Sequence, residues 1–385
     1  MIRALSGAAL AFSLIATPAL ARSAIAPPPV VAITPQEAQP KIQIAILLDT
    51  SSSMDGLINQ AREQLWKVVN TFATAKKEGK RPVLELALYE YGNDRLSAET
   101  GYIRQVSPFT TNLDKVSEQL FALRTNGGSE HCGQVISKAT EQLEWSKNNK
   151  DLKLIYIAGN EAFTQGPVFF ETAVKAAIQN GIVVNTIHCG DERSGIAGKW
   201  KAAAARADGN FLTIDQNRAV AHIAAPQDAE IARLGAELNK TYVAFGREGG
   251  ESKERQAKQD ENAARGSAGV GMMRAVAKSS AQYDNSEWDL VDARKKGKVK
   301  LEELKPADMP APMKAMAPAE RTAYVEKMDK DRTEIQQKIQ ALNQEREKFV
   351  AAEQKKKAQD GTRTLDSAMV ESVRTQGARA AFEFQ

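Results

Sequence analysis

The sequence predicts an α/β fold, with a doubly wound, mostly parallel six-stranded sheet followed by an α-helical C-terminal region. Between about residues 41 and 220, apolar runs of strand length alternate with amphipathic runs of helix length. The strand runs are almost continuously apolar, as expected where helices cover both faces of a parallel sheet. Beyond about residue 225 aromatic residues become sparse, charged residues become more frequent and no strand pattern remains.

The alternation places each element in turn. Strands are expected at 42–48, 83–91, 152–158, 181–189 and 210–214, with a short edge strand at 101–106. Helices are expected at 57–75, 112–123, 133–145, 167–180 and 195–207. Because crossover helices join parallel strands, the carboxyl ends of the strands meet at one edge, and binding sites in such sheets lie beyond that edge.

The C-terminal region divides into a helical or irregular part at 225–308, a Pro/Met/Ala linker at 309–320 and a helical tail at 321–385. The tail has a narrow seam of apolar residues at spacings of three and four, in which two positions hold arginine. The apolar members are Val325, Met328, Ile335, Ile339, Leu342 and Phe349, and the arginines are Arg332 and Arg346. The seam predicts either a short coiled coil or packing against the chain's own helices, and the arginines favour the second interpretation.

The N-terminus has the pattern of an export signal over residues 1–21. Arg3 supplies the positive region, an apolar stretch too short to span a bilayer follows, and Ala-Leu-Ala at 19–21 is a small-x-small cleavage site. Residues 22–40 are Pro-rich and predict a linker. No later segment is apolar enough to anchor the chain, so we expect a periplasmic or secreted protein.

Composition argues against nucleic acid as a partner. The chain is 42% hydrophobic and 26% charged, with a net charge of +4 over 385 residues. A nucleic-acid-binding protein would concentrate basic residues together with base-stacking aromatic residues. The basic runs at 75–82 and 294–298 are instead interpreted as solvated loops.

The segment IAILLDTSSSMDG at 44–56 combines a buried strand with a polar turn. Asp49, Ser51 and Ser53 form Asp-x-Ser-x-Ser at the predicted carboxyl end of the first strand. A tight turn can direct this carboxylate and these two hydroxyls into one small volume. Such oxygen donors suit a hard divalent cation, Mg²⁺ first, with Ca²⁺ and Mn²⁺ as alternatives. The other interpretation is a hydroxyl-rich strand cap that holds no ion.

These residues resemble the von Willebrand factor type A (VWA) domain family and its metal-ion-dependent adhesion site (MIDAS). LLDTSSSM is similar to the first loop of that site, TNGGSEHCG at 125–133 to the second, and IAGNEAF at 157–163 to the third. The resemblance extends over about 42–220 and includes the order of strands and helices, which implies a VWA domain at 41–224.

The resemblance implies further site residues. Ser129 takes the place of the family's metal-ligating threonine, and Asn160 takes the place of an aspartate. Asparagine brings no negative charge, so Glu130 and Glu161, which flank these positions, are candidate charge donors. In the family, an acidic side chain of a protein partner commonly completes the coordination of the ion, and such a partner is expected here.

The two cysteines, Cys132 and Cys189, would both lie near the edge that carries these loops. Because an exported protein meets an oxidising compartment, a disulfide between them is the first expectation. Two free thiols, or a zinc site that adds His131 and His188, are the alternatives. In a strand, however, His188 and Cys189 point to opposite faces.

The sequence contains none of the common catalytic signatures. It has no G-x-S-x-G, H-E-x-x-H, Walker A or G-x-G-x-x-G motif, and its three histidines are His131, His188 and His222. We therefore expect a binding or assembly module rather than an enzyme. The rival from another class is a structural scaffold with a metal-free site, which acts through its helical C-terminal region. A metal-dependent hydrolase is the less favoured alternative.

Overall fold

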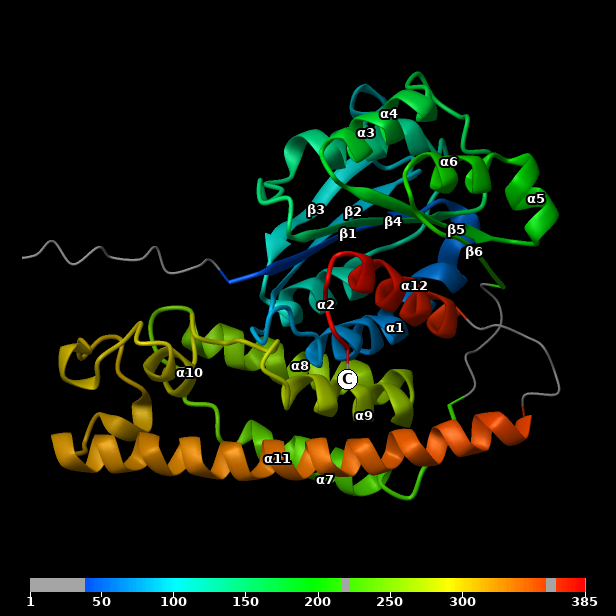
Figure 1. Cartoon of the computed structure of the whole chain (residues 1–385). Helices are drawn as coiled ribbons and strands as arrows, with labels where there is room; N and C mark the ends of the chain where they lie inside the picture. The colour runs from blue at the N-terminus through cyan, green and yellow to red at the C-terminus, as the bar shows by residue number, and fades with distance from the viewer. Residues whose placement is uncertain (1–38, 216–221, 358–364, 385) are drawn as a thin grey trace, which may run out of the picture. The chain divides into compact units, whose positions relative to one another are not determined.

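The structure is a computed structural model that describes residues 39–215, 222–357 and 365–384 (Figure 1). The predicted signal peptide at 1–21 and nearly all of the predicted linker at 22–40 lie outside the described residues. The described residues from Gln39 onward form one compact unit. The C-terminal helices therefore belong to the same unit as the sheet.

The predicted α/β fold class is confirmed by a six-stranded sheet in the order β3-β2-β1-β4-β5-β6. All neighbours pair in parallel except β2 and β3, which are antiparallel. The strands are β1 (Lys41–Asp49), β2 (Val83–Tyr91), β3 (Ile103–Thr110), β4 (Leu152–Gly159), β5 (Val183–Cys189) and β6 (Phe211–Ile214). Asp49, Tyr91 and Gly159 therefore lie side by side at one edge of the sheet, called here the carboxyl edge.

Six helices are interleaved with these strands. They are α1 (Asp55–Ala73), α2 (Leu113–Ala122), α3 (Cys132–Gln142), α4 (Phe170–Gln179), α5 (Glu192–Ala197) and α6 (Trp200–Arg206). The single helix expected at 195–207 is divided into α5 and α6. The division falls at Gly198 and Lys199, and Lys199 has a left-handed φ of 71° that a helix cannot continue through.

Alternate residues of each strand supply two hydrophobic cores. In β1, Ile44 and Leu48 enter the core on the α1 and α2 side, whereas Ala45 and Leu47 enter the core on the α3, α4 and α6 side. Figure 1 shows these helices on opposite faces of the sheet. The near-continuous apolar pattern of the strands follows from this double burial.

The C-terminal region is helical, as predicted. Its helices are α7 (Asp228–Asn239), α8 (Gly249–Gly266), α9 (Ala268–Lys278), α10 (Leu290–Lys295), α11 (Pro318–Lys357) and α12 (Leu365–Arg379). Residues 309–320, predicted as a linker, bury Met309 and Met313 in a third hydrophobic cluster.

The last helix, α12, returns to the sheet and packs beside α1 (Figure 1). Gln376 exchanges side-chain hydrogen bonds of 2.6 and 3.1 Å with Asn185 of β5. Ser372 accepts a hydrogen bond of 2.8 Å from Asn210 and lies 3.3 Å from the Tyr156 hydroxyl. One layer of the α/β fold is therefore completed by the C-terminal end of the described chain.

Buried arginines join the C-terminal helices to one another and to the sheet's helices. Arg274 of α9 is 1% exposed and makes ion pairs with Asp114 of α2, at 2.7 Å, and with Asp260 of α8. Its guanidinium also lies over the Trp66 ring of α1, 4.6 Å from the centroid. We call this contact between α1, α2, α8 and α9 the helical joint.

The apolar seam of α11 packs against the chain's own helices α7, α9 and α10. Val325 and Ile339 are buried, Arg332 pairs with Asp289 at 2.6 Å, and Arg346 pairs with Asp228 at 2.7 Å. The seam arginines therefore bind acids of the chain's own C-terminal region, and the described part of α11 packs within the chain rather than in a coiled coil.

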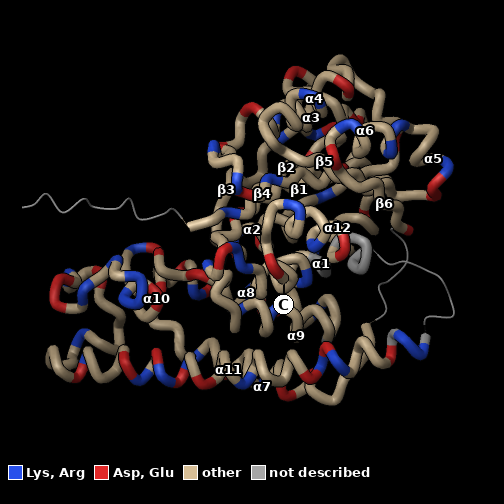
Figure 2. The backbone as a smooth tube through the Cα atoms, viewed as in Figure 1, with Lys and Arg blue, Asp and Glu red and all other residues tan. Residues whose placement is uncertain are grey.

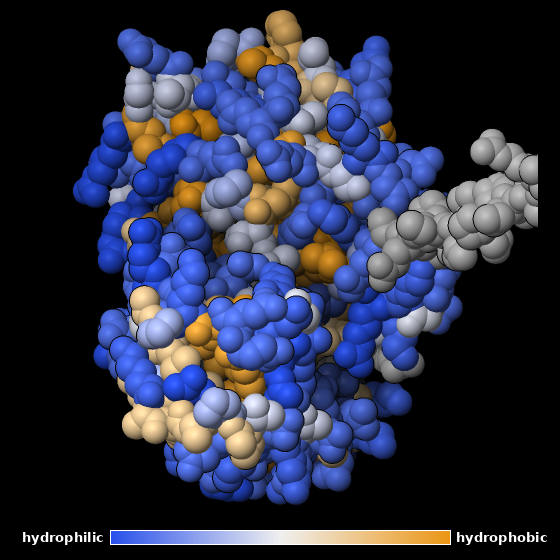
Figure 3. Space-filling model, turned by 90° about the vertical axis from the view of Figure 1, so that its left-hand side faces the viewer, coloured by the Kyte–Doolittle hydropathy of each residue, from blue (hydrophilic) through white to orange (hydrophobic). Residues whose placement is uncertain are grey.

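The surface is hydrophilic over most of the face in Figure 3, and residues of both charge signs alternate along α11 in Figure 2. Among the described residues, the large hydrophobic side chains that stand exposed are Phe169 and Ile196. None of the described helices combines the length and the apolar character needed to cross a membrane.

Candidate metal centre

The first loop of the site follows β1 at the carboxyl edge. Asp49 is fully buried, and its Oδ1 accepts a hydrogen bond of 2.8 Å from the Ser51 backbone N–H. This bond closes a tight turn, after which the short helix η1 (Ser52–Met54) leads into α1. The Ser51 hydroxyl lies 3.4 Å from that of Ser53. The structure therefore brings the three residues of Asp-x-Ser-x-Ser together.

The second loop is held against the first by backbone hydrogen bonds. Ser52 N–H donates to the Gly127 carbonyl at 2.7 Å, and Gly127 N–H donates back to the Ser52 hydroxyl at 2.8 Å. A β-carbon at Gly128 would lie 1.8 Å from the Gly92 carbonyl oxygen, so this close approach requires glycine. The loop continues through Ser129, which is half-buried, to Glu130, which is buried.

The third loop contributes Asn160, directly after β4. Its side-chain N–H donates to the Ser53 hydroxyl at 3.2 Å, so the third loop is connected to the first. Its Oδ1 is buried and has no hydrogen-bond partner among the described residues. Gly159 lies against the aspartate, because a β-carbon there would be 3.0 Å from Asp49 Oδ2.

The two buried acids of the site face each other across Gly92. A β-carbon at Gly92 would lie 2.9 Å from Asp49 Oδ1 and 2.9 Å from Glu130 Cγ. Burial raises the pKa of Asp49 to about 7; the Ser51 hydrogen bond opposes this rise and Glu130 adds to it. Burial likewise raises the pKa of Glu130, with a further contribution from Glu161.

These residues fit a divalent cation. Asp49 Oδ2 and Asn160 Oδ1 are both buried without a hydrogen-bond partner among the described residues, although buried acceptors in proteins are almost always paired. No lysine or arginine of the described chain pairs with Asp49 or Glu130. Two buried carboxyls and an amide oxygen beside serine hydroxyls form the hard oxygen set that Mg²⁺, Mn²⁺ and Ca²⁺ prefer.

Glu161, the other candidate charge donor, lies outside this cluster. It is exposed, its side chain accepts a long hydrogen bond of 3.5 Å from Gln165, and its backbone carbonyl accepts from the Trp200 indole. Glu130 is 5% exposed. Of the two flanking acids, Glu130 is therefore the one that is buried beside Asp49.

The disulfide predicted between Cys132 and Cys189 is wrong, because both cysteines are free and buried. Cys132 belongs to the core on the α3 side of the sheet, and Cys189 belongs to the core on the α1 side. The sheet therefore separates the two thiols, whereas a disulfide needs β-carbons about 4 Å apart.

The zinc alternative is also contradicted. Within the described ranges, no three His, Cys, Asp or Glu side chains form a metal-binding group. His131 Nδ1 lies 3.2 Å from Gln134 Oε1, and His188 Nε2 lies 2.9 Å from the Ser194 hydroxyl. Both histidines thus have local partners on separate elements. A cation at the carboxyl edge would accordingly rely on hydroxyl and amide oxygens as well as carboxylates.

Gly92 is a site residue outside the three predicted loops, and Gly159 lies in the predicted third loop without a role having been assigned to it. Each directly follows or ends a strand at the carboxyl edge, and each leaves room for the Asp49 carboxylate. The available signal was a glycine directly after each of two predicted strands, 83–91 and 152–158. It was weak, because glycine is common wherever a strand turns into a loop.

Residues 43–217 match the family model of the von Willebrand factor type A domain. The matched range contains all three loops of the site. It ends just after β6, before the helices α7 to α12.

Several solved structures resemble part of the chain. Proximal thread matrix protein 1 from the mussel byssus, with zinc occupied MIDAS motif, is 14% identical with a TM-score of 0.34, and the match covers 47% of this chain and 43% of that chain. The SpRpn10 VWA domain is 15% identical with a TM-score of 0.33, covering 45% and 88%. BatB from Bacteroides thetaiotaomicron is 14% identical with a TM-score of 0.35, covering 45% and 90%.

This chain spans less than half the length of the mussel protein. No curated protein matches the chain in sequence. The loops at the carboxyl edge, the sheet order and the family match agree with one another. Residues 43–217 therefore form a von Willebrand factor type A domain.

Proposed function

We propose that the protein is an exported binding module that recognises a protein partner through a divalent cation at the carboxyl edge. The observation that carries the proposal is the pair of buried acceptors, Asp49 Oδ2 and Asn160 Oδ1, that have no partner among the described residues. A buried acceptor without a hydrogen bond costs about 1–3 kcal/mol, and a bound cation removes that cost.

The proposed donors come from the three loops. Asp49, Ser51 and Ser53 hold the ion from the first loop, Ser129 from the second and Asn160 from the third, directly or through water. The ion is Mg²⁺ in the first instance, with Mn²⁺ and Ca²⁺ as alternatives, since all three prefer oxygen donors. The cation supplies a positive centre toward which a carboxylate can be directed.

Glu130 is the proposed source of the charge that Asn160 lacks. It is buried beside Asp49, and its charge adds to the rise in the pKa of Asp49, so a cation between the two acids would relieve this repulsion. Glu161 is exposed and is proposed to act at longer range. Replacing Glu130 by glutamine should therefore weaken cation binding far more than the matched replacement of Glu161.

An acidic side chain of the partner is proposed to complete the coordination of the ion. A divalent ion with few protein carboxylates retains positive charge, and this charge favours an incoming carboxylate. We propose that the protein acts by binding rather than by catalysis. We propose the periplasm or the extracellular space as its location.

A capture experiment with full-length protein tests this function. The immobilised chain is exposed to envelope extract in Mg²⁺. An Asp49→Asn bait serves as the site variant, and a Lys175→Ala bait, changed at an exposed position of α4, serves as the remote control. We expect a partner that binds to the wild-type and control baits and is released by EDTA. The same partner should not bind to the Asp49→Asn bait. If every captured protein stays in EDTA and also binds Asp49→Asn, the proposal is wrong and the metal-free scaffold is favoured.

A further inference from the structure

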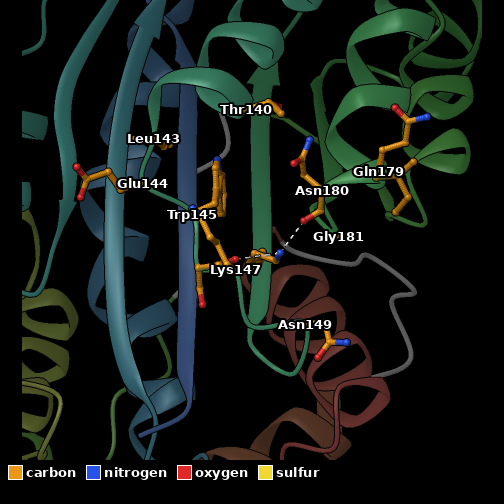
Figure 4. Close-up of a pocket in the computed structure, with 12 residues that line it drawn as sticks. Thr140, Leu143, Glu144, Trp145, Lys147, Asn149, Gln179, Asn180 and Gly181 are labelled. Carbon is orange, nitrogen blue, oxygen red and sulfur yellow. Dashed lines mark hydrogen bonds between the residues drawn. The ribbon is translucent and has the colours of Figure 1, made fainter. Parts of the chain in front are cut away.

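A hollow of about 720 Å³ lies at the opposite edge of the sheet from the candidate metal centre. Residues that end or follow α3 form one wall, including Thr140 and Trp145, and the end of α4 forms the other, including Asn180 (Figure 4). Lys153, the second residue of β4, also lines the hollow. Lys153 pairs with Gln43 of β1, so Asp49 lies about 20 Å farther along the strands.

Lys153 buries a positive charge at this hollow. Its side chain is 7% exposed, and its ammonium donates to the carbonyls of Asn180 at 2.5 Å and Ser146 at 3.2 Å. Among the described residues, no carboxylate forms an ion pair with it. An ammonium has three protons, so one donor remains beyond the two carbonyl contacts.

Asp151, the acid whose charge acts on Lys153, does not neutralise it by contact. Asp151 is engaged elsewhere, since it accepts hydrogen bonds from the Lys41 backbone at 2.9 Å and from the Ser146 hydroxyl at 2.6 Å. Burial lowers the pKa of Lys153, and Asp151 opposes this effect only through space. Buried charges are normally paired, so the Lys153 ammonium is suited to pair with a carboxylate that enters the hollow.

The α3 wall of the hollow carries a second polar group that is suited to a ligand. The Thr140 hydroxyl is buried and has no hydrogen-bond partner among the described residues. Close to it, the Trp145 indole N–H donates to the Ala139 carbonyl at 2.9 Å, and the ring packs edge-on against Phe109 with centroids 4.8 Å apart. The indole is therefore held in place, and it offers a rigid apolar surface to the hollow.

We propose that this hollow binds a small carboxylate that carries a flat apolar group. The carboxylate would accept the remaining proton of Lys153, the flat group would lie along Trp145, and a polar atom of the ligand would pair with the Thr140 hydroxyl. The same chemistry is offered by a free aromatic acid and by the C-terminal carboxylate of a peptide that ends in an aromatic residue.

Calorimetry on the full-length protein tests the proposal with defined probes. Indole-3-acetate represents the free acid, and indole-3-acetamide is its neutral match. A short peptide ending in tryptophan is tested as the free acid and as the C-terminal amide. We expect saturable binding of one or both acids, and binding of the amides at least about tenfold weaker, because the charge-assisted hydrogen bond is lost.

Variants identify the residues responsible. Lys153→Met should weaken binding by at least about tenfold, and Thr140→Val, which keeps the shape of the side chain, by about threefold. Lys175→Met removes the same charge from an exposed position on α4 and should leave binding unchanged. Asp49→Asn, at the metal edge, should also leave it unchanged. Thermal melting establishes that each variant is folded.

Three results would overturn the proposal. The first is the absence of saturable heat for both acids at millimolar concentration. The second is equal binding of an acid and its amide. The third is a folded Lys153→Met or Thr140→Val protein whose affinity equals that of the wild type. Binding of the peptide acid alone would support the proposal and assign the ligand to a chain terminus.

Discussion

The helical joint and the candidate metal centre both bury carboxylates, but their surroundings differ in charge. At the joint, Asp114 is 3% exposed and lies 2.7 Å from Arg274, which is 1% exposed. At the metal centre, Asp49 is fully buried beside Glu130, and no arginine or lysine of the described residues pairs with either acid.

This difference shows in the pKa values of Arg274 at the joint and of Asp49 at the metal centre. At the joint, burial lowers the pKa of Arg274, but Asp114, Tyr283 and Asp260 outweigh it and hold that pKa above its usual range. At the metal centre, burial raises the pKa of Asp49 to about 7, and the neighbouring acid adds to the rise. The joint is thus electrostatically complete within the chain, whereas the metal centre requires a proton or an external cation.

The largest effect is expected from breaking the joint. Arg274→Met should lower the free energy of unfolding by about 3–5 kcal/mol, because it leaves Asp114 and Asp260 without their guanidinium partner. Urea unfolding of the full-length chain measures the change. A loss below about 1 kcal/mol would show that the joint does not depend on this ion pair.

An intermediate effect is expected from pH at the metal centre. Since folding raises the pKa of Asp49 to about 7, the folded state binds this proton more tightly than the unfolded state does. Protonation of Asp49 therefore stabilises the folded protein. Without divalent cation, the free energy of unfolding should therefore fall as pH rises from about 4 to about 7, by on the order of 2–4 kcal/mol from this group. Asp49→Asn should remove that part of the slope.

Cation should reverse this loss. At pH 8, Mg²⁺ at about a hundred times its dissociation constant should raise the free energy of unfolding by about 2.7 kcal/mol. The matched control is Asp114→Asn, whose acid is already paired, and Mg²⁺ should stabilise that variant as much as the wild type. Equal stabilisation of Asp49→Asn would contradict the assignment.

A smaller effect is expected from restoring the missing acid. Asn160→Asp adds a third carboxylate at the metal centre, so it should tighten Mn²⁺ binding by about tenfold and destabilise the cation-free protein at pH 8. Titration calorimetry and thermal melting measure the two effects. If affinity stays unchanged, Asn160 lies outside the coordination sphere.

The smallest effect is expected at an exposed ion pair. Arg233 contacts Glu230 and Glu237 on the surface of α7, with half of its side chain exposed. Because solvent already screens these charges, Arg233→Gln should leave the urea midpoint unchanged within error. A clear shift would mean that exposed pairs, as well as buried ones, contribute to stability here.

Periodicity and spacing were sufficient to predict the sheet and the first loop of the site. The strand at 42–48 and Asp49 directly after it were placed correctly, because a buried strand and its polar end leave a local pattern. Gly92 was not identified as part of the site, and Gly128 was placed in the second loop without a role of its own. Their importance arises from a contact between two loops, in which a β-carbon at Gly128 would meet the Gly92 carbonyl.

The wrong disulfide and the unpredicted position of α12 also depend on contacts between distant parts of the chain. The disulfide between Cys132 and Cys189 was expected from compartment chemistry, but the two thiols lie in cores on opposite faces of the sheet. The return of α12 to the sheet was likewise not predicted. Its contacts, such as that between Asn185 and Gln376, join residues far apart in the sequence, and no local pattern encodes such a contact.

The most direct test of the account is a titration of the full-length, EDTA-treated chain with Mn²⁺ at pH 8. We expect one ion per chain, binding at least about tenfold weaker in Glu130→Gln, no binding in Asp49→Asn, and wild-type binding in Glu161→Gln. Absence of both heat and a melting shift in the wild type, or equal binding by Asp49→Asn, would contradict the claim that the buried acids at the carboxyl edge share a divalent cation.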